Sequence, residues 1–93
     1  MKSSVTKHGD LVVTRYDLKG GEKVPMHKHS PEYEHITICA KGEINIDFPN
    51  SDVLVKLLSG DMIDYAKDQQ EHEIEAVTDA VVFNIPKKKA PTE

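Results

Sequence analysis

Three of the five histidines in this chain lie close together, at His27, His29 and His35. Imidazole is the side chain that most often ligates metals in proteins. His27 and His29 are two residues apart, so on an extended chain both side chains leave the same face, whereas a helix would separate them by about 200°. The spacing therefore indicates a pair of metal ligands on a strand or an extended loop.

A fourth histidine, His72, follows later in the chain, and the carboxylate of Glu34 directly precedes His35. Neutral imidazoles suit transition metals, whereas Mg and Ca prefer oxygen ligands. A divalent ion with three or four protein ligands keeps a coordination position for water or substrate if it is five- or six-coordinate, as catalytic sites do. We therefore expect one divalent transition metal (Fe, Mn, Ni, Zn or Cu) that polarises a carbonyl, acidifies a bound water or binds dioxygen.

Length and composition restrict the class of protein. Ninety-three residues, 38% hydrophobic and 30% charged, form a single globular domain over residues 1–93. A formal net charge of −4 argues against a nucleic-acid-binding protein, which carries a basic face. No stretch approaches the roughly 20 apolar residues of a membrane span. The start lacks the apolar region of a secretory signal, and the single Cys39 excludes an internal disulfide, so we expect a cytoplasmic protein.

Hydrophobic alternation predicts an all-β chain of about seven or eight strands, because no long segment has apolar residues at helical spacing. Turn-forming residues separate short runs rich in β-branched side chains, a pattern typical of an antiparallel sandwich or small barrel. Residues 1–10 are expected to be a loose segment or an edge strand, and residues 86–93 a basic flexible tail that begins where Pro86 ends the last strand. The predicted strands cover 11–18, 24–26 leading into the histidines, 35–40, 44–48, 53–58, 62–65, 72–77 and 80–85.

Two spaced motifs in the chain resemble those of the cupins, which are small antiparallel barrels of the double-stranded β-helix or jelly-roll type. In the first motif Gly21 is followed by five residues and then by His27-Lys28-His29, and Gly42 closes it. In the second, Gly60-Asp61 leads to His72, although the proline that the family has in this loop is replaced by Ala66. The resemblance implies a cupin barrel, homodimerisation, and dioxygenase, isomerase or lyase chemistry on small molecules.

The first motif departs from the family pattern at its acid. Glu34 has the usual gap from His29 but lies one residue too far from Gly42, whereas His35 has the usual gap to Gly42. Neighbouring side chains on a strand face opposite ways, so only one of them points at the metal. Loops absorb insertions more easily than strands, which favours His35 with Glu34 in reserve. Against this choice, an inward Glu34 would bring Ile36 and Ile38 into the core.

The predicted metal ligands are therefore His27, His29, His35 and His72. If His35 points inward, Thr37 and Cys39 share its face and line the pocket with Tyr65. We expect a metal-dependent enzyme that acts on a small polar or carbonyl-bearing molecule. The alternative is a non-catalytic module that binds a small ligand or senses metal. We also expect a homodimer, because Leu11–Leu18 carries apolar residues on both faces.

Overall fold

The structure is a computed structural model that describes residues 1–27, 33–64 and 71–88; positions 25–27, 33, 34, 87 and 88 are described by their backbone only. The predicted site residues His29 and Tyr65 therefore lie outside the described residues. So does the proposed tail from residue 89 onward. No helix long and apolar enough to cross a membrane occurs in the described ranges.

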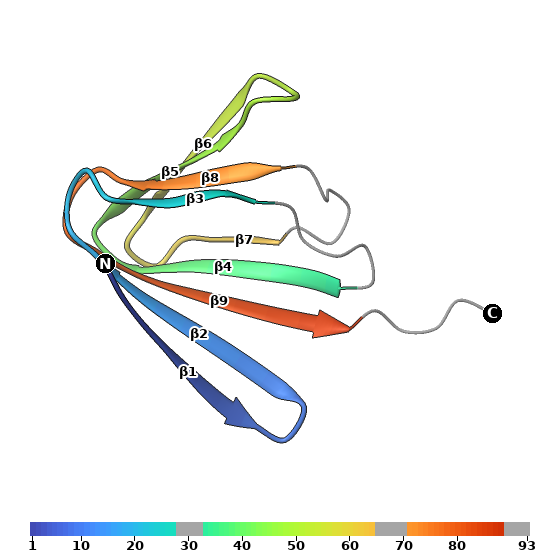
Figure 1. Cartoon of the computed structure of the whole chain (residues 1–93). Coiled ribbons are helices and arrows are strands. Elements are labelled where there is room, and N and C mark those ends of the chain that lie inside the picture. Colours follow the sequence, from blue (N-terminus) through green and yellow to red (C-terminus); the bar gives the residue numbers. More distant parts are fainter. Residues whose placement is uncertain (28–32, 65–70, 89–93) are drawn as a thin grey trace.

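Two antiparallel sheets face each other in the fold (Figure 1). The larger has the order β1-β2-β9-β4-β7 and the smaller the order β3-β8-β5-β6. Strands distant in sequence are neighbours in both, as expected for a jelly-roll barrel. The all-β prediction is confirmed. The described strands are β1 (Lys2–His8), β2 (Leu11–Leu18), β3 (Lys23–His27), β4 (Tyr33–Lys41), β5 (Glu43–Phe48), β6 (Val53–Leu58), β7 (Met62–Asp64), β8 (His72–Ala76) and β9 (Ala80–Lys88).

The core lies between the two sheets and follows the alternation of the sequence. In β5, Ile44, Ile46 and Phe48 are buried, whereas Asp47 between them is exposed. The same period of two appears in β8, whose first, third and fifth residues are buried. Leu57 from β6 completes the core of the smaller sheet, and Leu18, Cys39, Ala80 and Val82 contribute from the larger one.

Strand β1 resolves one open expectation. Residues 2–8 form an edge strand that pairs in register with β2, from Lys2 opposite Asp17 to His8 opposite Leu11. Every residue of β1 is exposed on this strand. The β1–β2 hairpin lies farthest from the smaller sheet in Figure 1, which explains why pairing with β2 is not accompanied by burial.

The end of the last strand was predicted wrongly. Pro86 does not stop β9, which continues to Lys88 and pairs with β4, where Pro86 lies opposite His35. A proline is tolerated in a strand where its missing N–H would face no partner. The described pairing of β9 with β2 extends only to Asn84, so beyond that residue one side of β9 is an edge. The strands also number nine in the described residues rather than seven or eight.

Candidate metal centre

Strand β4 carries His35 into the core. His35 is 7% exposed, and Thr37 and Cys39 on the same face are fully buried. Ile36 and Ile38, on the opposite face, are only half-buried. The strand therefore has the register in which His35, Thr37 and Cys39 point inward. This is the face that the spacing to Gly42 favoured for His35, although burial alone does not make it a metal ligand.

His72 enters the core from the other sheet. It is the first residue of β8, is 1% exposed, and shares its face with Ile74 and Ala76. Its ring packs against Phe48 of β5, with the two ring centroids 5.6 Å apart and the planes tilted by 44°. The phenyl ring of Phe48 thus forms one wall beside the His72 imidazole.

The two buried histidines lie toward the same end of the barrel. His35 is near the start of β4 and His72 is at the start of β8, and Figure 1 shows both strand starts on the same side of the molecule. Strand β4 belongs to the larger sheet and β8 to the smaller one. Two imidazoles therefore project into the space between the sheets from opposite walls.

His27 reaches the same region by strand pairing. It is the last residue of β3 and lies directly opposite His72 in the antiparallel pair of β3 and β8. The register shifts between Val24 and His27, which marks a bulge or irregularity. Bulges are common beside functional sites, where they redirect side chains. Two of the four histidines predicted to bind metal thus occupy facing positions on adjacent strands.

The rest of the predicted ligand set lies outside the description. His29 and Tyr65 are not among the described residues, and the side chains of His27 and Glu34 are not described. Within the described part of the chain, no group of three or more His, Cys, Asp or Glu side chains is arranged to hold a metal. Of the predicted ligands, His35 and His72 have described side chains, and both are buried toward the same end of the barrel, so the four-histidine set remains a prediction.

Sequence reasoning missed Asn84 of β9. The Thr37 hydroxyl donates a hydrogen bond to the Asn84 side-chain oxygen at 3.2 Å, and this joins β4 and β9 on their inner face. The alternation of β9 contains the signal, because Ala80 and Val82 are buried and Asn84 has the same parity. The amide side chain of Asn84 therefore interrupts an apolar pattern, and it lies beside Thr37, which shares its face with His35.

Cys39 lies four residues beyond His35, near the other end of β4. Its thiol contacts the carbonyl oxygens of Lys41 and Gly42, at 3.6 and 3.4 Å. Burial raises the pKa of this thiol, and the negative charge of Asp61 raises it further. A neutral, buried thiol behaves as a small apolar core residue.

Comparison with known proteins identifies the architecture. No protein-family model matches the sequence, and no curated protein matches it. An RmlC-like cupin protein from Desulfovibrio desulfuricans superposes with a TM-score of 0.78 at 21% identity, over 91% of this chain and 79% of that one. A cupin-2 domain containing protein from Shewanella frigidimarina gives a TM-score of 0.74 at 20% identity, over 95% and 80%.

A longer protein also contains this fold. An HTH_3 family transcriptional regulator from Vibrio cholerae superposes with a TM-score of 0.76 at 19% identity, over 95% of this chain but 51% of the regulator. At such identities the likeness concerns the fold alone.

Proposed function

Because this chain has the cupin fold, we propose that it binds one divalent transition metal between its two sheets. The proposed ligands are His27, His29, His35 and His72, with Glu34 in reserve for His35. The observation that carries the proposal is the burial of His35 and His72 on opposite sheets toward one end of the barrel. Imidazole is the side chain that most often ligates metals, and two of them on opposite walls at one end of the barrel suit a single ion between the sheets.

The donor set fits Fe, Mn, Ni, Zn or Cu. Imidazole nitrogen is a good ligand for most of these ions, whereas Ca and Mg prefer oxygen ligands. When bound, such an ion supplies Lewis acidity toward a carbonyl or an activated water. We propose an enzyme of the dioxygenase, isomerase or lyase type acting on a small polar or carbonyl-bearing molecule.

Residues of this chain have definable roles in that proposal. Phe48 packs against the ring of His72 and forms an apolar wall beside it. The hydrogen-bonded pair of Thr37 and Asn84 presents polar groups on the inner face next to His35. Such groups orient a polar substrate by hydrogen bonding within an otherwise apolar pocket.

Elemental analysis of protein purified without added metal tests the proposal directly. We expect close to one first-row transition ion per chain, and retention of the ion should be lost in His72→Ala. His8→Ala is the matched control, because His8 is exposed on β1 and belongs to no proposed site. A protein that contains no transition metal and takes up none of Fe, Mn, Ni, Cu or Zn on titration contradicts the proposal.

A second function is a ligand-binding or metal-sensing module without turnover. The likeness to about half of a transcriptional regulator favours it, because there the fold occurs within a larger regulatory chain. Turnover screens on the metal-loaded protein separate the two functions. Product formation that is lost with His72→Ala supports the enzyme, and saturable one-to-one ligand binding without product supports the module.

We further propose that the protein is a homodimer formed through the outer face of the larger sheet. Arg15, Phe83, Ile38 and Met62 are successive register partners across β2, β9, β4 and β7. Met62 is 62% exposed, and Ile38 and Phe83 are only half-buried. Phe83, Ile38 and Met62 form an apolar band across β9, β4 and β7, bordered by the charged Arg15 of β2. An apolar band across several strands is typical of an association surface, and a two-fold axis lets the same band pair with itself.

Sedimentation analysis at tens of micromolar tests the dimer. We expect twice the 10.4 kDa chain mass for the native protein and the chain mass for Ile38→Glu. Leu54→Glu is the control, because Leu54 is 63% exposed on β6 of the other sheet. A native protein that sediments as a single chain contradicts the proposed dimer, and dissociation by Leu54→Glu would assign the interface to the smaller sheet.

A further inference from the structure

A cavity of about 670 Å³ opens at one end of the larger sheet. Its apolar wall includes the half-buried Val81 and the buried core residues Leu18 and Ala80, and Lys2, Lys19 and Lys41 also line it. We call this cavity the lysine pocket. It lies at the opposite end of β4 from His35, since six residues of an extended strand span about 20 Å. The lysine pocket is therefore separate from the candidate metal centre.

Strand register brings two of the lysines to one row of the sheet. Lys2 of β1 lies opposite Asp17 of β2, and Asp17 lies opposite Val81 of β9. On its other side, Val81 lies opposite Lys41 of β4. The row thus has a lysine at each end and crosses four strands. Lys19 follows directly after β2 and lines the same cavity. Three lysines from separate segments converge here in a chain whose formal net charge is −4.

The carboxylates of the cavity already have partners. Both oxygens of Asp17 accept hydrogen bonds from the Arg15 guanidinium, at 2.9 and 3.1 Å. Arg15 thereby holds the pKa of the Asp17 carboxyl below its usual range. Asp17 is therefore ionised with Arg15 as its hydrogen-bonded partner, and the charge of Lys2 makes a smaller contribution to its lowered pKa.

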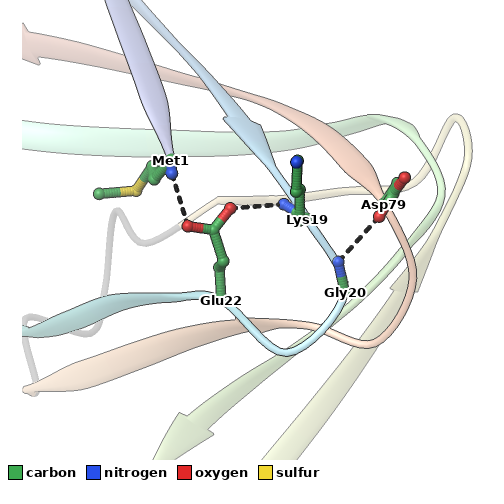
Figure 2. Close-up of polar contacts among 5 residues, drawn as sticks. All are labelled: Met1, Lys19, Gly20, Glu22 and Asp79. Atoms are coloured by element: carbon green, nitrogen blue, oxygen red, sulfur yellow. Dashed lines mark hydrogen bonds and ion pairs between the residues drawn. The ribbon is translucent and has the colours of Figure 1, made fainter.

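Glu22 and Asp79 also accept hydrogen bonds, although the partner of Asp79 is a neutral backbone N–H (Figure 2). The Glu22 carboxylate accepts hydrogen bonds from the backbone N–H of Lys19 at 2.8 Å and from the terminal ammonium group of Met1 at 2.5 Å. Asp79 accepts the backbone N–H of Gly20 at 2.9 Å. These bonds fix the β2–β3 turn and use the carboxylate oxygens for structure.

The ammonium groups of two pocket lysines act on these carboxylates through their charge, since Lys2 lowers the pKa of Asp17 and Lys19 lowers that of Glu22. Among the residues that the structure describes, the ion pairs involve Met1, Arg15, Lys23 and Lys56 and none of the three pocket lysines. Positive groups beside an apolar wall, with the neighbouring acids already bonded, favour an anion that also carries an apolar part.

We propose that the lysine pocket binds a small organic anion, with a carboxylate or phosphate group held by Lys19 and Lys41 and a short apolar body against Leu18, Ala80 and Val81. Lys2 adds positive charge at the rim. Binding here does not depend on the proposed metal centre, so either proposal can fail without the other.

Amide-resolved NMR titration of the ¹⁵N-labelled protein tests the site, with hexanoate, acetate and inorganic phosphate as probes. We expect saturable shifts at Leu18, Gly20, Ala80 and Val81 with dissociation constants of about millimolar. Hexanoate binding more tightly than acetate supports contact with the apolar wall, and phosphate binding more tightly than hexanoate identifies phosphate as the preferred group. Equal, unsaturated responses to all three probes contradict the proposal.

Matched variants assign the charge. Each lysine of an exposed ion pair contributes roughly a two- to fivefold change in affinity, so Lys19→Gln with Lys41→Gln should weaken binding by about four- to twenty-five-fold. Lys7→Gln with Lys56→Gln removes the same charge from exposed positions outside the pocket. An equal loss of affinity in this control pair overturns the proposal, as do shifts confined to His35 and His72.

Discussion

Gly42 lies against the backbone of Asp79 so closely that a Cβ at position 42 would be 2.2 Å from the Asp79 carbonyl oxygen. Its φ is +86°, a region that favours glycine. Gly42→Ala therefore combines backbone strain with a clash against main chain, and we expect it to lower the free energy of unfolding by about 3 kcal/mol or more. Urea denaturation measures this loss.

Gly60 provides the control. Its φ is +92°, but a Cβ there would meet no atom within 4 Å. Gly60→Ala should therefore cost only the strain, about 1–2 kcal/mol. Equal losses in the two variants would show that the contact with Asp79 relaxes without cost.

Substitutions at positions 34 and 35 test which of the two side chains binds the proposed metal. His35 is buried, so we expect His35→Ala to lose bound metal far more severely than Glu34→Ala. Removing a direct ligand deletes a bond to the ion, whereas a supporting residue typically changes affinity by about 10- to 100-fold. Metal content after dialysis measures the difference. If Glu34→Ala empties the site and His35→Ala leaves it filled, Glu34 is the ligand.

Cys39 should resist modification in the native protein. Its side chain is fully buried, and the raised pKa keeps the thiol protonated near neutral pH. Thiolate is the reactive form, so we expect negligible reaction with an aromatic disulfide reagent at pH 8 and rapid reaction in denaturant. Stoichiometric labelling before unfolding would show that β4 opens near Cys39.

The ion pair of Arg15 with Asp17 predicts a pH dependence. The hydrogen bond from Arg15 lowers the pKa of Asp17 in the folded state, so its contribution to stability is present above the ordinary carboxyl pKa. That contribution is lost as the pH falls through the lowered folded pKa. Carboxyl-carbon NMR should show the Asp17 pKa returning toward its ordinary value in Arg15→Gln, and an unchanged pKa would mean that Arg15 is not its main partner.

The sequence predicted those features that depend on local alternation. Ile44, Ile46 and Phe48 were expected on one face and are buried together. The spacing from Gly60-Asp61 to His72 resembles a cupin motif, and that resemblance implied the barrel. Strand ends were less predictable. Pro86 remains in β9 because it pairs with β4 on one side, while the pairing with β2 on the other side is described only as far as Asn84. Local composition does not show which distant strands pair.

The lysine pocket was missed for a similar reason. Lys2, Lys19 and Lys41 are unremarkable in the sequence, and only the register of four strands brings them to one cavity. His27 and His72, in contrast, could be selected from the sequence, because both occur in the two spaced motifs that resemble those of the cupins. Their pairing across β3 and β8 is a feature of the structure.

The pairing of β3 with β8 has a consequence for synthesis on the ribosome. The β1–β2 and β5–β6 hairpins join neighbouring segments, so each is able to form soon after it emerges. Strand β3 cannot pair until β8, which begins at His72, has been made. The second partner of β2 is β9, which begins only at Ala80. Such non-local contacts form slowly. In these early hairpins, β2 and β5 therefore each keep an unpaired edge until β9 and β8 have been made. The histidines on β3 and β8 come together only when most of these 93 residues have been made.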